Sequence, residues 1–362
     1  MKKEIIGYGS FFHKIDETQI KESSTITFFQ DHKLFYTGRH AIKFIIETIN
    51  ETKDVETIWL PKYYCQHVTA WIKHNYNNVG FYDIDPFQIN HIVQLDPSLF
   101  QNPNDIVLLN NFWGIFNYDL PNNPTRAIIL EDHSHGWLSN SCINSSADIC
   151  ITSLRKTLPV PLGAMAWVPK GSSLKINWGD NSTNVSEKTT QTFIINAWNS
   201  IDKAMELKSN CSIEENKQEY LELYSLAENY LHNQYEIIPV TIEHRDYINA
   251  YLTKDYQSYK TENLNYLHSR ISTFKDLDIL WQDGNTTFGL NVPFERRTDF
   301  DRLKSHLIEH KIYPSELWPG NSVDTKFKYL MNIHVDFRYN KTDLDYLMET
   351  LSHFFRFKNE LV

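Results

Sequence analysis

Six short runs of consecutive apolar residues constrain the fold of this chain more than any other feature. They lie at residues 57–60, 79–82, 106–109, 127–130, 149–151 and 164–168. The runs are continuous rather than alternating in polarity, as in strands that helices cover on both faces. Apolar residues at helical spacing follow Arg39 and Pro61. The sequence therefore predicts an α/β fold with a mostly parallel sheet.

The last third of the chain changes character and predicts a second domain. An apolar stripe at helical spacing extends from Tyr220 to Leu231, and we expect a further helix at residues 264–274. Strand and helix patterns then alternate, at residues 287–292, 300–310, 330–335 and 342–355, the last with a capping box of Thr342 and Asp345. Because 362 residues exceed one ordinary core, we predict a three-layer α/β/α large domain at residues 1–262 and a small α+β domain at residues 263–362.

Charge and composition exclude several classes of partner. The formal net charge is −10, so the basic surface of a nucleic-acid-binding protein is missing. No apolar run approaches the roughly 20 residues of a membrane helix, and the N-terminal residues contain no signal-peptide apolar region. Four cysteines without CxxC spacing, at positions 65, 142, 150 and 211, favour reduced thiols and a cytoplasmic location.

The residues directly after the apolar runs carry the chemistry, because ligands of parallel sheets bind at the carboxyl ends of the strands. One run is followed by Glu131-Asp132-His133-Ser134-His135, and another by Thr152-Ser153-Leu154-Arg155-Lys156. A turn at residues 37–41 starts the first helix, where backbone N–H groups can hold a phosphate. An acid, a lysine and a phosphate cradle together outline a site for pyridoxal 5'-phosphate. A carboxylate keeps its pyridine nitrogen protonated, and a lysine holds it as a Schiff base.

These residues resemble the fold-type I aminotransferases, in particular the DegT/DnrJ/EryC1/StrS family, which acts largely on nucleotide-linked keto sugars. The resemblance covers nearly the whole chain. It rests on the acid signature Glu131-Asp132-x-x-His135, on Ser153-x-x-Lys156, on the loop Gly38-Arg39-His40-Ala41 and on the strand end Leu60-Pro61. Where the family usually has a glycine pair after the lysine, this chain has Gly163-Ala164, which is typical of a divergent subgroup.

The resemblance implies a role for each matching residue. Lys156 would be the Schiff-base lysine, Asp132 would face the pyridine nitrogen, and His135 would lie near the ring oxygen. The phosphate would be held by Ser153 together with Gly38, Arg39 and His40.

The residue that stacks on the cofactor ring is less directly implied. The family places an aromatic side chain four residues after the strand-terminal proline, and this chain has Cys65 there. Tyr63 and Tyr64 come just before it, and we predict that Tyr64 takes this place.

The resemblance also implies an activity and an assembly. The protein would be an aminotransferase that moves an amino group from glutamate or glutamine to a keto acceptor, such as a nucleotide-linked keto sugar in cell-surface polysaccharide or related biosynthesis. A lysine at position 156 argues against the related sugar dehydratases, which have histidine there. We expect a homodimer with its sites at the interface and no nucleic-acid or membrane partner.

Other interpretations of the same residues stay open. Lys156 could be an ordinary surface lysine, and Asp132 a local helix cap. His133 and His135 could indicate a metal site, but no further ligands at zinc-like spacing are evident, so we predict no metal. The whole protein could be another pyridoxal phosphate enzyme, such as a lyase, or a catalytically silent relative that serves binding or assembly.

Two further residues have two interpretations each. Trp113 either lines the substrate pocket or belongs to the core. Arg338 either meets a substrate carboxylate or phosphate, or forms a structural pair with Asp336 or Glu316.

Overall fold

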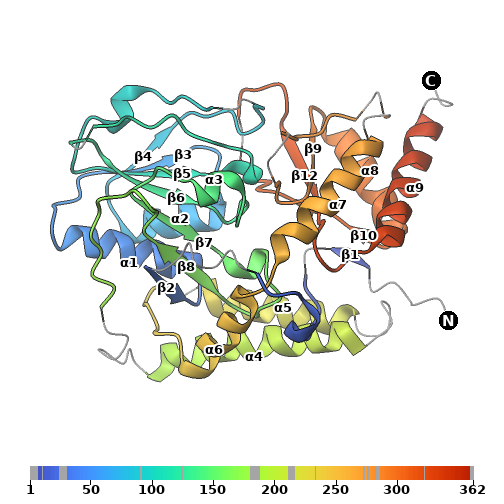
Figure 1. Cartoon of the computed structure of the whole chain (residues 1–362), viewed down its shortest axis with the longest axis horizontal. Coiled ribbons are helices and arrows are strands. Elements are labelled where there is room, and N and C mark those ends of the chain that lie inside the picture. The colour runs from blue at the N-terminus through green and yellow to red at the C-terminus, as the bar shows by residue number, and fades with distance from the viewer. Residues whose placement is uncertain are drawn as a thin grey trace.

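The centre of the protein is a seven-stranded sheet in the order β2-β8-β7-β6-β5-β3-β4 (Figure 1). The computed structural model describes residues 7–9, 11–23, 31–89, 92–123, 125–179, 188–210, 217–232, 234–271, 274, 277–282, 286–321 and 323–358. The strands are β2 (His32–Phe35), β3 (Ile58–Pro61), β4 (Val79–Tyr82), β5 (Ile106–Asn110), β6 (Ile128–Asp132), β7 (Ile149–Thr152) and β8 (Ala164–Trp167). All six predicted runs form strands of this sheet.

The strand directions confirm a mostly parallel sheet. The pairings that link β4, β3, β5, β6 and β7 are parallel, whereas β8 is antiparallel to both β7 and β2. Strands β5, β6 and β7 are buried along their whole length, which explains their continuous apolar sequence. Their carboxyl ends therefore open at one edge of the sheet.

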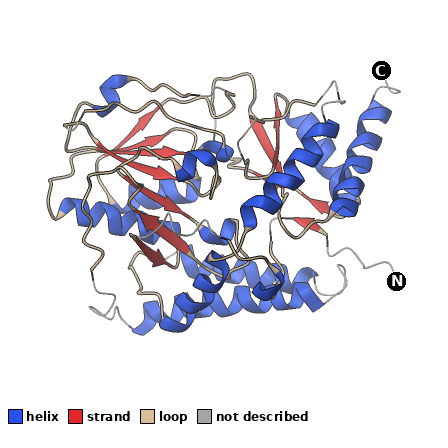
Figure 2. Cartoon of the chain, in the orientation of Figure 1, coloured by secondary structure: helices blue, strands red, loops and turns tan. Residues whose placement is uncertain are grey.

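Helices flank the sheet, as the α/β prediction requires (Figure 2). They are α1 (Gly38–Asn50), α2 (Gln66–Asn75), the short α3 (Asn140–Ile143), α4 (Lys188–Asn210), α5 (Lys217–His232) and α6 (Ile242–Leu252). Helix α1 packs on β2, β7 and β8, and α4 lies along α5. Within the part of the chain that the structure describes, no helix is both long and apolar enough to cross a membrane.

A second core lies beside the first. Strands β9 (Leu290–Phe294), β11 (Ser315–Glu316) and β12 (Tyr329–Ile333) form an antiparallel sheet, which packs with α7 (Tyr256–Ile271), α8 (Arg297–Glu309) and α9 (Lys341–Lys358). Near the N-terminus, β1 (Tyr8–Gly9) pairs with β10 (Ile312–Tyr313), so Tyr8 is buried in this second core. The domain boundary at residues 262 and 263 falls inside α7 and stays a prediction.

The predicted capping box at the last helix is displaced by two residues. The backbone N–H of Asn340 donates to Asp343 (2.9 Å), and the Asn340 side chain accepts from the N–H groups of Thr342 and Asp343 (2.9 and 3.2 Å). Asp345 pairs instead with Arg270 at 2.6 Å. Asparagine is among the preferred N-cap residues, and Asn340 occupies the N-cap position that was predicted for Thr342.

Candidate functional site

Three elements meet at the carboxyl edge of the sheet and bring the predicted site residues together. Asp132 is the last residue of β6, and Lys156 ends a short 3₁₀ turn that follows β7. Gly38 is the first residue of α1. Asp132, Gly38, Ser153 and Lys156 all line one slot of about 120 Å³. The slot exists because β6 and β7 are parallel neighbours, so both strands end at the same edge.

The start of α1 forms one end of this slot. The Thr37 hydroxyl caps the helix and accepts from the backbone N–H of His40 at 3.2 Å. The N–H groups of Gly38 and Arg39, in the first turn, have no partner within the helix. A Cβ placed on Gly38 would meet only the Cβ of Ser153, at 3.8 Å. The end is therefore an open cradle of backbone donors, suited to an anion such as a phosphate.

Asp132 is buried and held from both sides. Its Oδ2 accepts from the Tyr64 hydroxyl at 2.5 Å, and its Oδ1 accepts from the N–H of Ser134 at 2.8 Å. Burial and the adjacent Asp132 raise the pKa of Tyr64, so its phenol keeps the proton that it donates. Tyr64 itself is fully buried, and the side chain that lines the slot at this point is Cys65. The structure thus shows Tyr64 as a support for Asp132, and its stacking on a cofactor stays a prediction.

Lys156 reaches the other predicted ring neighbour. Its Nζ lies 3.3 Å from Nε2 of His135. Burial, and then the charge of Lys156, lower the pKa of His135 well below its usual range, so the imidazole is neutral and Nε2 accepts. The proton is then on Nδ1, which is buried and has no hydrogen-bond partner within the described part of the chain. An amine and an unpaired ring N–H therefore belong to one cluster.

Helix α5 closes the slot from outside, an arrangement that no sequence pattern indicated. Glu228 forms an ion pair with Arg155 at 2.5 Å, and Nη2 of Arg39 donates to the carbonyl of Leu231 at 3.0 Å. The Arg39 guanidinium, predicted to hold phosphate, thus neutralises the carboxyl end of α5. Arg155 in turn lowers the pKa of Glu228 and keeps its carboxyl charged. The apolar stripe predicted the buried face of α5, but nothing in it indicated that Glu228 faces Arg155.

A wider chamber of about 520 Å³ adjoins the slot at Lys156. Its walls are largely apolar and aromatic and come from distant parts of the chain, including Phe11, Phe288 and Trp318. Trp318 and Phe288 flank His135, with ring centroids 4.9 and 4.6 Å away. An apolar cavity with a few converging polar groups is the usual form of a small-molecule site.

The remaining predicted residues line neither cavity. His40 is buried, and burial lowers its pKa to about 3. Trp113 belongs to the core and donates to the carbonyl of Pro86 at 2.7 Å. Arg338 pairs with Asp336 at 2.7 Å, as in the structural interpretation.

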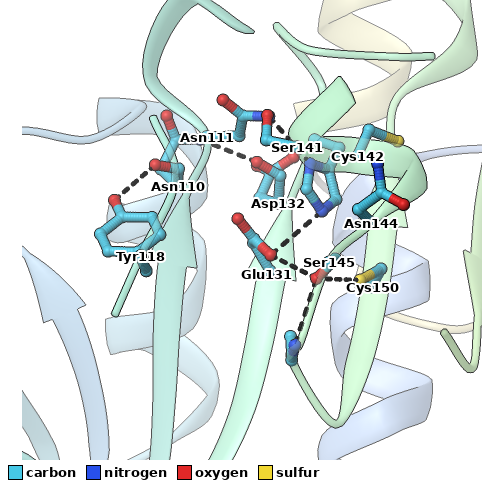
Figure 3. Close-up of polar contacts among 12 residues, drawn as sticks. Asn110, Asn111, Tyr118, Glu131, Asp132, Ser141, Cys142, Asn144, Ser145 and Cys150 are labelled. Carbon is cyan, nitrogen blue, oxygen red and sulfur yellow. Dashed lines mark hydrogen bonds and ion pairs between the residues drawn. The ribbon is translucent and has the colours of Figure 1, made fainter. Parts of the chain in front are cut away.

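A buried polar network surrounds Glu131 near the end of β6 (Figure 3). Glu131 faces Nε2 of His133 at 3.2 Å and accepts from Ser145 at 2.5 Å. Asn111 binds the other ring nitrogen of His133 at 3.1 Å. Glu131, His133 and Cys150 are the one group of three that could hold a metal ion among the described residues. His133 and His135 point to different partners, and the absence of a metal stays a prediction.

Comparison with known proteins identifies the fold. No protein-family model matches the sequence, and no curated protein does. Among solved structures, a GDP-4-keto-6-deoxymannose-3-dehydratase with a trapped PLP-glutamate geminal diamine is 14% identical, with a TM-score of 0.58 over 95% of this chain and 100% of that chain. CalS13, a sugar aminotransferase from Micromonospora echinospora, is 12% identical, with a TM-score of 0.56 over 96% and 99%.

A third structure agrees. Spr1654 from Streptococcus pneumoniae, assigned as a sugar aminotransferase and solved in its PMP form, is 11% identical, with a TM-score of 0.57 over 98% of this chain and 94% of that chain. These likenesses extend over nearly the full length of every chain compared, and they confirm the predicted α/β architecture. The chain therefore has the fold of these sugar aminotransferases and of that dehydratase.

Proposed function

We propose that this protein is a pyridoxal phosphate-dependent aminotransferase. The observation that carries the proposal is the convergence of Asp132, Lys156 and the open cradle at Gly38 and Ser153 around one slot. The donor set fits the cofactor: an anion cradle lies at one end, a buried carboxylate lines the slot, and an amine stands at its junction with the chamber. The unpaired Nδ1 of His135 adds a donor for a ring oxygen.

Each side chain has a distinct task in this proposal. When bound, pyridoxal phosphate supplies an electron sink for the α-carbon of an amino acid. Lys156 would hold the cofactor covalently and would move the proton of the donor's α-carbon as a general base and acid. Asp132 would lie against the ring nitrogen, and Tyr64 and Ser134 fix the orientation of its carboxyl group.

The reaction partners follow from the same proposal. The amino donor is glutamate or glutamine, and the acceptor is a keto compound of the nucleotide-linked sugar class, used in cell-surface polysaccharide or related biosynthesis. Structural neighbours are sugar aminotransferases and a sugar dehydratase, which supports this class. The reaction would take place in the cytoplasm and in a homodimer.

Absorbance spectroscopy of the protein loaded with pyridoxal phosphate tests the proposal. Borohydride should fix the cofactor on Lys156, as peptide mapping would show, and Lys156→Ala should bind it only non-covalently and lose activity almost completely. L-glutamate should convert the aldehyde form stoichiometrically to the amine form. Covalent label on another lysine would refute the site, and release of products without that conversion would identify a lyase.

A further inference from the structure

A further large cavity lies at the amino edge of the central sheet, opposite the edge that forms the slot. Its volume is about 670 Å³, against about 520 Å³ for the chamber. Its walls include Ile128, the first residue of β6, and Asp148, which directly precedes β7. Residues 170–175, which follow the antiparallel strand β8, line it from the same edge. No residue of this cavity lines the slot or the chamber.

The walls of this cavity are positively charged, although the chain as a whole is acidic. Lys53, Arg126, Lys170 and Lys175 line it, and Asp148 is the one carboxylate among its described lining residues. The chain has a formal net charge of −10, so an excess of three positive charges around one cavity is a local reversal of sign. A concave site lined by one sign of charge focuses the field and attracts ligands of the opposite sign.

The carboxylate of Asp148 is already occupied. Nη1 and Nη2 of Arg126 donate to its two oxygens at 2.5 and 3.2 Å, and the backbone N–H of Ile129 donates to it at 2.7 Å. Nε of Arg126 donates in turn to the carbonyl of Pro121 at 3.0 Å. This pair fixes the loop before β6 to the start of β7, and the charges of Arg126 and Asp148 offset each other.

The three lysines keep their charges available to a ligand. Within the described part of the chain, none of them forms an ion pair, and Lys53 makes one long hydrogen bond, to the carbonyl of Pro103 at 3.4 Å. Lys53 comes from the segment after α1, whereas Lys170 and Lys175 come from the segment after β8. A ligand with several anionic oxygens can contact ammonium groups of both segments at once, and such charge-assisted hydrogen bonds are stronger than neutral ones.

The remaining walls add donors and an open approach. Gly171 has a φ of +131°, which favours glycine, and a Cβ placed there would meet nothing within 4 Å. Serine and asparagine side chains also line the cavity, at positions 122, 123, 144–146, 172 and 173. No aromatic side chain occurs among the described lining residues, so these walls offer no surface on which a base could stack. The site therefore suits a compact oxyanion.

We propose that this cavity binds a compact anion with more than one phosphate group, with Lys53, Lys170 and Lys175 contacting its oxygens and serine hydroxyls donating to them. The volume lies within the range of small-molecule sites, about 300–1,000 Å³. The same diphosphate chemistry occurs in free pyrophosphate and in nucleotides, and the lack of a stacking surface favours the free anion. The site is separate from the anion cradle at Gly38, and the inference does not rest on the proposed function.

Calorimetric titration of the full-length protein with pyrophosphate tests this site. The protein is titrated unloaded, and again after loading with pyridoxal phosphate and removal of the excess. We expect the same Kd in both states, because the cavity and the cofactor slot share no residue. The Kd should rise between about 50 mM and about 0.5 M salt, because the screening length shortens over that range. UDP should bind no more tightly than pyrophosphate.

Lysine variants locate the binding. Lys170→Gln combined with Lys175→Gln should raise the Kd of pyrophosphate roughly tenfold at low salt, the loss of two exposed charge contacts. Lys170→Arg combined with Lys175→Arg keeps both charges and should stay within about threefold of wild type. Lys62→Gln combined with Lys326→Gln is the matched control, because it changes the net charge equally at exposed lysines outside the cavity.

Four outcomes would overturn the inference. Wild-type protein that binds no pyrophosphate would remove the site. An unchanged Kd in the Lys170→Gln and Lys175→Gln protein, or an equal loss in the matched control, would show that binding does not occur in this cavity. Loss of pyrophosphate binding on loading with pyridoxal phosphate would place the anion in the cofactor cradle instead. UDP that binds tenfold more tightly than pyrophosphate would identify a nucleotide site and refute the ligand class. Failure of pyridoxal phosphate to bind would refute the proposed function alone, since the unloaded titrations and the variants still decide this inference.

Discussion

At the scale of single residues, only one of the two tyrosines before α2 contacts Asp132. Tyr64 donates to Asp132 at 2.5 Å, whereas Tyr63 donates to the carbonyl of Leu317 at 3.3 Å. Loss of a donor to a buried charged group costs on the order of 1–3 kcal/mol. We expect Tyr64→Phe to weaken binding of pyridoxal phosphate roughly tenfold and Tyr63→Phe to change it little, as measured by absorbance titration.

Asp132→Asn should impair the enzyme more than Tyr64→Phe does. It removes the charge at the ring nitrogen, so donor α-proton removal should slow far more than in Tyr64→Phe, while thermal unfolding stays close to wild type. Wild-type activity in Asp132→Asn would show that Asp132 is only a local turn contact. Equal losses in Tyr63→Phe and Tyr64→Phe would remove Tyr64 from the support of Asp132.

Lys208 on α4 makes stability depend on pH. It is buried and donates to the carbonyl of Phe11, and burial, with a smaller contribution from Arg338, lowers its pKa to about 7. The pKa of a lysine in the unfolded state is about 10.4. Between these two pKa values the unfolded state binds more protons than the folded state, so the stability of the fold rises with pH. Below pH 7 both states are protonated, and the full cost of burying the charge is present.

Lys208→Met should therefore stabilise the protein more at pH 6 than at pH 9, by on the order of 2 kcal/mol. Urea unfolding at the two pH values measures the difference. Lys203→Met, an exposed neighbour on the same helix, is the control and should show no such dependence. A gain that is the same at both pH values would mean that folding does not lower the pKa of Lys208.

At the scale of elements, the sequence predicted those that are defined by their own periodicity. Strands β3 to β8 were found because they are continuous apolar runs, of which β5 to β7 are buried along their whole length, and α1 because its apolar residues repeat at helical spacing. Strand β2 was missed, since His32 and Lys33 interrupt its apolar character. The capping box was displaced because Asn340, Thr342 and Asp343 offer competing caps whose choice depends on local geometry.

The residues of the candidate site show the same difference between local patterns and tertiary packing. Asp132, Lys156 and Gly38 could be predicted because they follow strands or start a helix, and parallel topology brings such positions together. Glu228, His334 and Phe11 could not, because their approach to the slot and chamber depends on how α4, α5 and the second core pack. No local pattern in the sequence encodes those tertiary contacts.

Helix α5 contributes a negative charge that competes with anionic ligands. Glu228 pairs with Arg155 beside the anion cradle. We expect Glu228→Gln to free the Arg155 charge and to lower the Kd of pyridoxal phosphate roughly threefold at low ionic strength. The gain should shrink at 0.5 M salt because salt screens the interaction over about 10 Å or less.

Glu219→Gln is the matched control for that prediction, because Glu219 lies on the same helix and only approaches Lys203 at 3.9 Å. It should leave the Kd unchanged at every salt concentration. Weaker cofactor binding in Glu228→Gln would instead show that the ion pair is needed to dock α5 over the slot.

At the scale of the whole molecule, the chamber is built from parts that are far apart in the sequence. Phe11 comes from the N-terminal segment, Tyr224 from α5 and His334 from the second core. Pairing of β1 with β10 joins the N-terminal segment to that core. Arg338 reinforces the joint by donating to the carbonyls of Gly9 and Phe11, at 2.8 and 3.0 Å. The chamber therefore depends on both cores being folded and docked.

Large apolar side chains exposed on the surface indicate how the protein assembles. Phe11, Phe193 and Leu226 are each about two-fifths exposed (40%, 38% and 42%), and the last two lie on α4 and on α5, the helix that also brings Glu228 to the slot. The sequence is 14% aromatic, and aromatic residues are preferred in interface cores. A symmetric dimer is the commonest closed assembly, and one formed here would place a partner next to the site. We therefore predict a homodimer that uses α4 and α5.

Sedimentation velocity of dilute protein, with and without pyridoxal phosphate, measures this assembly. Leu226→Glu should place a charge in the interface, shift the protein toward monomer and lower cofactor affinity together, because a shared site couples binding to assembly. Ile308→Glu on α8, with 41% exposure on the far core, should leave both unchanged. A wild-type monomer with full cofactor occupancy and activity would show that one chain completes its own site, with α5 closing the slot without help from a partner.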